Sequence, residues 1–360
     1  MARSAPAPSR RKTADGKSAP ERPGGHASSR SSGSVTLSDV AKLAGVSPIT
    51  VSRVLNRPEL VTQDTIDIVR EAIARTGYVP NLLAGGLASR RSRLVAALVP
   101  TIASSMFAET VESLTDRLAE AGYQVLLGLS GYPAVREDDL LDAILGRRPD
   151  GILLTGIKHS PATRQRLLAA RIPVVEIWDY TPTPIDTLVG FSHDEAGREV
   201  ADYLLAKGHR RFAVVSADDD RAALRQKGFL AELAARDITD ARIFTVPAPG
   251  TLGTGRESAA RLLDGEAPPE AVFCSSDILA QGVLAEALSR GLSIPGDLAV
   301  MGFGDLDFAA HTFPALTTVR IDRRAVGRLA AETMLARIDG RPGIETVIDI
   351  GFQVIERASA

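Results

Sequence analysis

A small set of polar side chains in the stretch SPITVSRVLN could bind a polyanion. If a helix begins at Ser47, four of them fall on one exposed side: Thr50, Ser52, Arg53 and Asn56. Hydroxyl and amide groups bind phosphate oxygens or base edges, and an arginine can donate two hydrogen bonds to guanine O6 and N7. The same residue types are common on the wet face of an ordinary helix, so the spacing alone leaves both interpretations open.

Three short helices are predicted to position this set. TLSDVAKLA (36–44) is apolar on one face, and Gly45 ends it. Ser47 then caps a second helix whose first residue is Pro48, a position where the missing N–H costs nothing and φ is already suitable. A third amphipathic helix is expected within 62–78. Two helices joined by a short glycine-containing turn, with a third behind them, form a helix-turn-helix unit.

From Leu94 onwards the pattern changes to short apolar strands that alternate with helical segments. Strands are expected at LVAALV, QVLLG, GILLT, PVVEI, FAVVS, AVFCS and LAVMGF, and helices at 106–121, 137–146, 194–207, 221–236 and 277–290. This alternation is typical of βαβ units and parallel sheets, in which ligands bind at the carboxyl ends of the strands. The segment is long for one sheet, which predicts two lobes, with LTTVRID (316–322) as a return crossing between them.

Charge is distributed unevenly along the chain. Residues 1–34 hold seven Lys/Arg against two Asp/Glu, and residues 35–93 hold eight against five, so these parts carry +5 and +3. Residues 94–360 hold 27 basic against 37 acidic residues, or −10. A basic head on an acidic body suggests a polyanionic partner for the head. Residues 1–34, rich in Ser, Pro, Gly and Arg, are expected to be a disordered basic tail.

Several classes of protein are disfavoured by the sequence. Cys274 is the only cysteine, so the chain has no intrachain disulfide, which suits a reducing cytosol. No apolar signal segment stands at the N-terminus, and no apolar run approaches a membrane span, so we expect a cytoplasmic protein with no membrane partner. Neither G-x-S-x-G, H-E-x-x-H nor a P-loop occurs. We therefore expect no enzyme activity, no catalytic or metal site and no cofactor.

The motifs together identify a family resemblance. LSDVAKLAGVSPITVSRVLN (37–56) is similar to the DNA-binding signature of the LacI/GalR family, and GYVPNLLAGGLAS (77–89) resembles the hinge element of that family. The match continues through ADYLLAKGHRRFAVV and PALTTVRID. The resemblance implies an all-α helix-turn-helix head and a two-lobed α/β body like the periplasmic binding proteins, with parallel sheets flanked by helices. It also implies a homodimer on double-stranded operator DNA.

The expected domains follow from this resemblance. They are the tail 1–34, the helix-turn-helix domain 35–79, the hinge helix and linker 80–93, and the effector-binding and dimerisation domain 94–360. Lobe 1 is expected at about 94–190 and 322–341, and lobe 2 at about 192–318 and 345–360.

The resemblance also assigns expected DNA contacts. Pro48 and Ile49 fall on positions that choose operator bases, and because they are apolar we expect them to read shape and methyl groups. Leu87 falls on the leucine that wedges into the minor groove at the operator centre, where an apolar side chain can unstack one base step. The full expected set is Thr36, Leu37, Ser47, Pro48, Ile49, Thr50, Ser52, Arg53, Asn56, Asn81 and Leu87.

Seven residues of the body are expected to contact a small effector. The resemblance nominates Phe107, Thr155, Glu176, Trp178, Arg225, Ser276 and Asp305. Phe107 and Trp178 fit either a cavity wall or core packing. Glu176 and Trp178 are two residues apart and are expected to share a strand face. Arg225 matches the arginine that clamps the effector in this family, and a guanidinium suits a carboxylate or a polyol.

Two departures from the family pattern bear on the effector. Ser276 stands where the family usually has Asn, and Gly304 stands where a carboxylate usually accepts hydroxyl protons from neutral sugars. Losing that carboxylate while keeping Arg225 favours an anion, although Asp277, Asp305 and Glu176 remain. Several segments most resemble gluconate-operon repressors, which implies a repressor released by a sugar acid. A regulator that senses a neutral sugar or needs a co-repressor, and a cytosolic sugar-acid-binding protein without operator specificity, are the alternatives.

Overall fold

The computed structural model describes residues 35–79, 91–132, 135–265 and 267–360. The chain divides into two compact units, residues 1–85 and 86–360. The expected tail, most of the expected hinge, and the candidate DNA contacts Asn81 and Leu87 lie outside the described residues.

The first unit contains the helix-turn-helix. Its helices are α1 (Leu37–Ala44), α2 (Pro48–Asn56), the 3₁₀ turn η1 (Pro58–Leu60) and α3 (Gln63–Thr76). Gly45 ends α1 with φ +66°, a left-handed conformation that glycine adopts without strain. One apolar face of each long helix forms a small common core: Val40, Ala41, Val51, Val54, Ile66, Val69 and Ala72.

Lobe 1 of the second unit is built on a sheet with strand order β11-β5-β4-β3-β1-β2, in which the paired strands run parallel. The strands are β1 (Leu94–Val99), β2 (Gln124–Leu129), β3 (Gly151–Thr155), β4 (Val174–Ile177), β5 (Thr187–Gly190) and β11 (Val347–Asp349). Its helices are α5 (Ser105–Glu120), α6 (Val135–Leu145), α7 (Pro161–Ala170) and α12 (Arg323–Ile338).

Lobe 2 repeats the plan with strand order β12-β10-β9-β8-β6-β7, in which only β12 pairs antiparallel. The strands are β6 (Phe212–Ala217), β7 (Arg242–Val246), β8 (Ala271–Cys274), β9 (Ala299–Gly304), β10 (Thr317–Arg320) and β12 (Gln353–Ile355). Its helices are α8 (His193–Ala206), α9 (Asp220–Ala234), α10 (Leu252–Leu263), α11 (Asp277–Ser289) and the 3₁₀ turn η2 (Asp307–Ala310).

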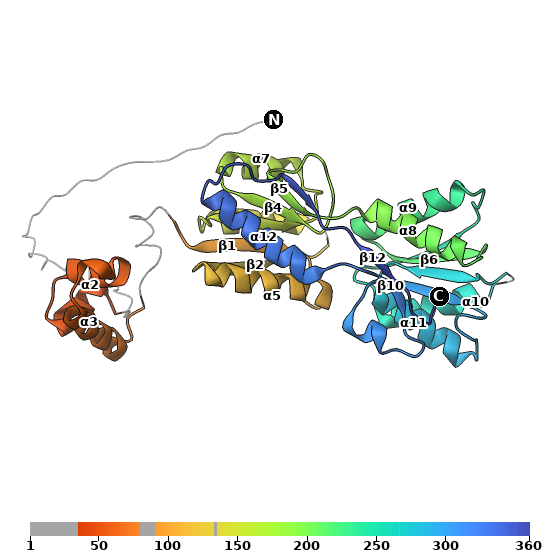
Figure 1. Ribbon diagram of the computed structural model, residues 1–360, viewed down its shortest axis with the longest axis horizontal. Coiled ribbons are helices and arrows are strands. Elements are labelled where there is room, and N and C mark those ends of the chain that lie inside the picture. The colour runs from red at the N-terminus through yellow and green to blue at the C-terminus, as the bar shows by residue number, and fades with distance from the viewer. Residues whose placement is uncertain (1–34, 80–90, 133–134, 266) are drawn as a thin grey trace, which may run out of the picture. The chain divides into compact units, whose positions relative to one another are not determined.

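The chain passes between the lobes after β5, after β10 and after β11, and Figure 1 shows the connecting segments side by side. The second crossing, at 321–322, lies in the segment where the sequence predicted a return. The third differs from the expected boundary at 345. β11 pairs with β5, so 347–349 belong to the sheet of lobe 1 and the chain crosses only afterwards. β11 has only three residues, too few to show strand alternation in the sequence, and its partner β5 was not predicted either.

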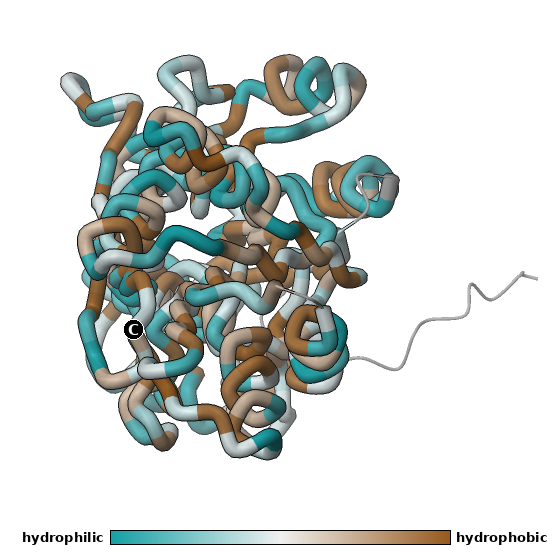
Figure 2. The backbone as a smooth tube through the Cα atoms, turned by 90° about the vertical axis from the view of Figure 1, so that its right-hand side faces the viewer, coloured by the Kyte–Doolittle hydropathy of each residue, from teal (hydrophilic) through white to brown (hydrophobic). Residues whose placement is uncertain are grey.

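Apolar runs explain why these strands are central. The five residues from Val95 to Val99 are all buried, as are the strands β8 and β9, because helices cover parallel sheets on both faces. In Figure 2 the helices change from brown to teal along their course, as expected of helices that bury one face. The expected fold class is confirmed. Within the described residues, every helix is too short or too polar to cross a bilayer.

Candidate functional site

The exposed end of α2 is built around Ser47. Its Oγ accepts a hydrogen bond from the backbone N–H of Thr50 at 3.2 Å and lies 2.9 Å from the Thr50 hydroxyl. Pro48 is the first helical residue, as predicted. Its missing N–H costs nothing there, because the N–H of a first helical residue has no acceptor within the helix. The helix therefore begins with a satisfied cap and two adjacent apolar side chains, Pro48 and Ile49.

The outer face of α2 carries the other expected DNA contacts. Ile49 is 65% exposed, although isoleucine is usually buried. The Arg53 side chain is exposed and has no ion pair within the described residues. The Nδ2 of Asn56 donates to the carbonyl of Ser52 at 2.9 Å and lies 3.3 Å from the Ser52 hydroxyl. The carbonyl oxygen of the Asn56 side chain remains available as an acceptor.

Thr36 and Leu37 begin α1. Thr36 forms a capping box with Asp39, in which its backbone N–H donates to Asp39 Oδ2 at 2.8 Å. Its hydroxyl donates to the same oxygen at 2.7 Å, and these bonds lower the pKa of Asp39. Leu37 is partly buried against the small core. Both residues thus fix the start of α1, and Thr36 stays exposed.

A cavity of about 300 Å³ lies between the lobes of the body. This interlobe cavity falls at the lower end of the size range of small-molecule sites. Lobe 1 contributes aromatic walls and lobe 2 contributes most of the polar groups. The lining from the two lobes includes Ser104, Phe107, Tyr132, Trp178, His193, Asp219, Arg221, Arg225, Thr251, Ser275 and Ser276.

Arg225 is held rigidly in the wall of the interlobe cavity. It is 6% exposed, its Nη2 donates to the carbonyl of Ser275 at 2.9 Å, and its guanidinium lies 4.0 Å from the ring centre of Phe303. Its Nη1 lies 3.0 Å from Nδ1 of His193. Burial lowers the pKa of Arg225 to about 10, so the group remains a cation at neutral pH. Its Nε is buried without a hydrogen-bond partner among the described residues.

His193 is fixed in one protonation state by its neighbours. Burial, followed by the charges of Arg225 and Arg221, lowers its pKa well below the ordinary value, so the ring is neutral. Nδ1 must accept from Arg225, and Nε2 then donates to the carbonyl of Trp178, 3.0 Å away. Because Trp178 belongs to lobe 1 and Arg225 to lobe 2, His193 joins the two walls of the cavity.

A second arginine of α9 also faces the cavity. Arg221 lies one turn before Arg225, and its guanidinium is 5.4 Å from the ring centre of Phe107. Neither arginine has a carboxylate within 4.0 Å in the part of the chain that the structure describes. Asp219, the one carboxylate among the described residues of the lining, caps α9 by accepting from the N–H groups of Arg221 and Ala222. Two guanidiniums thus face one carboxylate that is already engaged.

Trp178 belongs to the aromatic wall that lobe 1 contributes to the interlobe cavity. Its ring is buried against Phe107 and Phe191 in edge-to-face contacts, with ring centres 5.6 and 6.0 Å away, and its Nε1 donates to the hydroxyl of Thr110. Its backbone has φ +63°, a strained conformation for a bulky residue. Phe107 and Trp178 therefore serve both as core and as cavity wall, which joins the two interpretations that the sequence left open.

Two expected effector contacts lie elsewhere. Glu176 is buried in β4, where it accepts from the backbone N–H of Ile185 at 2.6 Å and lies 3.3 Å from His159. Asp305 forms ion pairs with Arg320 at 2.6 Å and Arg357 at 2.7 Å. Neither side chain lines the interlobe cavity. The expected shared face of Glu176 and Trp178 is also absent from the structure.

Two other expected effector contacts, Ser276 and Thr155, lie in the interlobe cavity and in a neighbouring cavity. Ser276 lines the interlobe cavity and caps α11. The hydroxyl of Thr155 donates to the carbonyl of Leu98 at 3.1 Å and lines a smaller neighbouring cavity. Asp277, next to Ser276, is fully buried and accepts from Leu306 N–H and the Thr318 hydroxyl, and burial raises its pKa to about 6. It fixes the end of β9 and does not face the cavity.

The side chain of His159 is buried between two acids. Its Nδ1 is 2.7 Å from Glu137 and its Nε2 is 3.3 Å from Glu176. Burial alone would lower the pKa of His159, but hydrogen bonds and charges from Glu137 and Glu176 outweigh it and raise the pKa to about 9. The imidazolium ties α6 to β4 inside lobe 1.

This cluster predicts a pH dependence of stability. Because the folded pKa of about 9 exceeds the unfolded value of 6.5, His159 contributes stability below pH 6.5 that is lost as the pH rises through 9. We expect the free energy of unfolding to fall by up to about 3 kcal/mol across this range. Urea unfolding followed by Trp178 fluorescence, which reports on the body, measures it. His159→Gln should be less stable at pH 6 and show a flatter profile; an unchanged slope would contradict the assignment.

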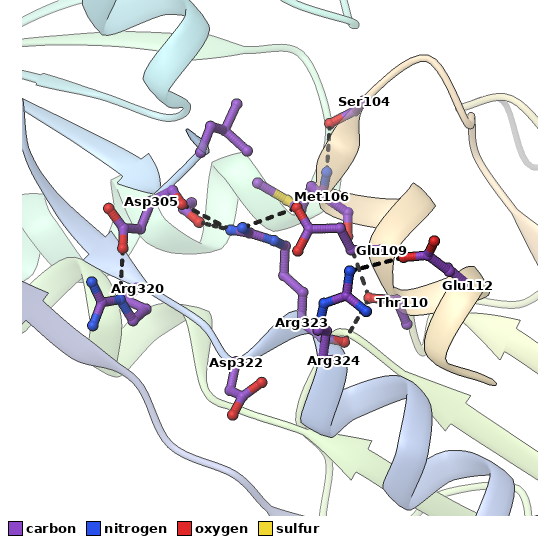
Figure 3. A network of polar contacts seen from close by, with 12 residues as sticks. Ser104, Met106, Glu109, Thr110, Glu112, Asp305, Arg320, Asp322, Arg323 and Arg324 are labelled. Carbon is purple, nitrogen blue, oxygen red and sulfur yellow. Dashed lines mark hydrogen bonds and ion pairs between the residues drawn. The ribbon is translucent and has the colours of Figure 1, made fainter. Parts of the chain in front are cut away.

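Two ion-pair systems join the lobes. Arg323, at the start of α12, donates to the backbone carbonyls of Gly304 and Asp305 in lobe 2 and pairs with Glu109 of α5 at 3.1 Å (Figure 3). Lys158 of lobe 1 pairs with Asp220 of lobe 2 at 2.5 Å, and both side chains are more than half exposed. The exposed pair is energetically weak, whereas Arg323 is largely shielded from water.

Sequence reasoning missed several lining residues. Five residues that were not predicted line the interlobe cavity: Tyr132, His193, Asp219, Arg221 and Ser275. Each follows or precedes a strand end or begins a helix of the body, which is where ligands of parallel α/β folds bind. That positional signal could have identified them.

Comparisons with known proteins agree with this architecture. Residues 36–81 match the lacI family of bacterial regulatory proteins, and residues 201–360 match the periplasmic binding protein-like domain. The HTH-type transcriptional regulator GntR of Pseudomonas aeruginosa is 39% identical over 332 residues, 92% of this chain and 97% of that protein. The chain therefore belongs to the lacI family of bacterial regulatory proteins, and the family expected from its sequence is confirmed.

Solved structures support the same assignment. A LacI-family transcriptional regulator from Silicibacter pomeroyi has a TM-score of 0.84 at 34% identity, covering 90% of this chain and 99% of that one. The transcription regulator GntR from Chromobacterium violaceum has a TM-score of 0.71 at 37% identity, covering 74% and 98%. The protein is thus a DNA-binding transcriptional regulator, of a family of regulators rather than enzymes.

Proposed function

We propose that the protein is a cytoplasmic, homodimeric repressor of a sugar-acid catabolic operon, released from its operator when a gluconate-like sugar acid binds in the interlobe cavity. The observation that carries the effector class is the pair of guanidiniums, Arg221 and Arg225, without a carboxylate within 4.0 Å among the described residues. Unpaired buried charge is costly, and an anionic ligand would offset it.

Three acidic residues that could disfavour an anionic effector form contacts within the protein and do not line the interlobe cavity. Asp277 binds the end of β9, Asp305 pairs with two arginines, and Glu176 binds Ile185 and His159. The hydroxyls of Ser104, Thr251 and Ser276 in the lining suit a polyhydroxylated molecule. The relatives named GntR support the same class of regulator.

The function is tested by titrating ligands against a preformed complex of the full-length protein with fluorescently labelled operator. Gluconate, 6-phosphogluconate and 2-ketogluconate should be compared with glucose and glucitol, which lack the carboxylate. We expect at least one sugar acid to lower the anisotropy to that of free DNA, and the neutral compounds to have no effect at the same concentrations. Release by a neutral sugar alone would overturn the proposed effector class.

Operator specificity needs its own measurement. Binding to operator and to a scrambled duplex is compared as salt rises, because phosphate contacts weaken for both sequences alike. We expect the preference for operator to persist. Equal affinity for the two duplexes at every salt concentration would instead indicate a sugar-acid-binding protein without operator specificity.

The start of α2 predicts two different mutant phenotypes. Because Ile49 is exposed and apolar, we expect Ile49 substitutions to change which operator is preferred, through contacts with base methyl groups. Thr50→Ala should instead weaken all operators alike, by roughly 10-fold or less, because a threonine hydroxyl suits a DNA phosphate oxygen, which is the same in every sequence. A panel of operator variants in gel-shift titrations separates the two. If Ile49→Ala weakens every operator equally, this assignment is wrong.

A further inference from the structure

A side cavity of about 90 Å³ adjoins the interlobe cavity and shares Tyr132, Asp219 and Arg221 with it. Lobe 1 adds Thr155 and Asp179 to its lining. A ligand that fills the interlobe cavity and is longer than that space would extend into this side cavity. The chemistry of the side cavity therefore constrains the far end of the effector.

Asp179 is the unusual group of the side cavity. It is only 4% exposed, yet no cation lies within 4.0 Å of its carboxylate among the described residues. Its Oδ1 accepts from the backbone N–H of Tyr180 at 2.9 Å, whereas Oδ2 has no hydrogen-bond donor in the same part of the chain. Asp179 lines the side cavity, so this acceptor oxygen is available to a ligand there.

Arg221 faces the same side cavity from the opposite lobe. Its guanidinium also lacks a hydrogen bond and an ion pair within the described residues. Attraction between Arg221 and Asp179 is felt across the cavity, but the two groups are more than 4.0 Å apart. An acceptor in lobe 1 and a donor in lobe 2 are thus left without partners.

The other charges around the side cavity are already matched. Lys158 pairs with Asp220 at 2.5 Å, and Glu137 pairs with the His159 imidazolium at 2.7 Å. Asp219 caps α9. Only Asp179 and Arg221 among the charged groups of this lining remain for a ligand.

We propose that the side cavity binds an uncharged, hydroxyl-bearing end of the effector, with one hydroxyl donating to Asp179 Oδ2 and accepting from Arg221. A hydroxyl is both donor and acceptor, so one group satisfies both partners. A terminal phosphate or second carboxylate could bind Arg221, but it would face the buried charge of Asp179. The effector is therefore an aldonate whose carboxylate lies near Arg225 and whose polyol end joins the two lobes. This inference rests on the proposed function.

The test measures direct binding to the full-length protein through its single tryptophan, Trp178, which lines the interlobe cavity. Gluconate has a neutral far end, glucarate has a carboxylate there, 6-phosphogluconate has a phosphate, and glycerate is too short to reach. We expect wild-type protein to bind gluconate more tightly than the other three.

Two variants from opposite lobes test the residues. Asp179→Asn keeps an acceptor for Tyr180 N–H but loses the charge, so it should weaken gluconate about 10-fold. Arg221→Gln should weaken gluconate by a similar factor. Glycerate should bind Asp179→Asn as it binds wild type, and glucarate should bind it no worse. Asp218→Asn, an exposed neighbour with the same charge change, is the matched control and should have no effect. Thermal melting without ligand checks the fold of each variant.

The outcomes separate this inference from the proposed function. If glucarate or 6-phosphogluconate binds wild type at least as tightly as gluconate, the neutral-end assignment is wrong while a sugar-acid repressor still stands. The assignment also fails if Asp179→Asn weakens glycerate and gluconate equally, or weakens neither. If no sugar acid changes the fluorescence or releases the operator, the proposed function itself fails, and the side-cavity assignment fails with it.

Discussion

Arg225→Met should leave operator binding intact and remove the response to sugar acids. The guanidinium is buried in the cavity wall, carries its charge at neutral pH, and lacks a carboxylate partner among the described residues. Deleting one partner of a buried charge pair commonly costs 2–5 kcal/mol. We therefore expect the sugar-acid concentration needed for half-release to rise by at least about 30-fold.

The measurement is operator release followed by fluorescence anisotropy. Methionine keeps much of the apolar contact of Arg225 with Phe303 and removes the charge. Arg164→Met, on the exposed face of α7 and without an ion pair in the described structure, is the matched control and should behave as wild type. Unchanged half-release in Arg225→Met would refute the role of this arginine, provided that its melting temperature shows a folded body.

Arg53→Ala should cost most of the operator specificity. The side chain is exposed on α2 and unpaired within the described residues, so a base edge could accept both of its hydrogen bonds. One such contact is worth about 1–3 kcal/mol of discrimination, which corresponds to roughly 5- to 150-fold in the operator-to-scrambled ratio. Gel-shift titrations against both duplexes at one salt concentration measure this ratio.

Arg75→Ala is the matched control for this change. Arg75 carries the same charge in the same unit and is exposed on α3, where it lies 4.0 Å from Glu71. If Arg75 contributes only its positive charge, Arg75→Ala lowers the affinities for operator and for scrambled duplex by the same factor and leaves their ratio unchanged. An equal loss of ratio in the two variants would show that net charge, and not the position of Arg53, sets specificity.

Much of the fold was predictable because its strongest elements have strong patterns. The five helices expected in the body are α5, α6, α8, α9 and α11, each within two residues of the expected ends. The strands that were missed, β5, β7, β10, β11 and β12, have three to five residues, and several mix polar with apolar positions. Their register depends on neighbouring strands, which a local pattern does not contain.

The effector site was predicted less well because several of its expected residues lie at strand ends, where the backbone turns and strand alternation no longer applies. Strand alternation would place Glu176 and Trp178 on one face, but β4 ends at Ile177 and Trp178 has φ +63°, so the alternation stops between them. Asp305 follows Gly304 and has φ +48°, which directs it toward Arg320 and Arg357. Local turns of this kind are not visible as a period in the sequence.

His193 has a consequence for what the regulator can sense. An imidazole in a ligand site would ordinarily make the response vary with acidity, because its charge changes near neutral pH. Here burial and two neighbouring arginines keep the ring neutral, and both of its nitrogens are committed to the protein. Ligand binding in the interlobe cavity is therefore not expected to change with the titration of His193 near neutral pH. If the effector is a sugar acid, as proposed, release from the operator follows the concentration of the acid and not that of the protons released when the acid forms.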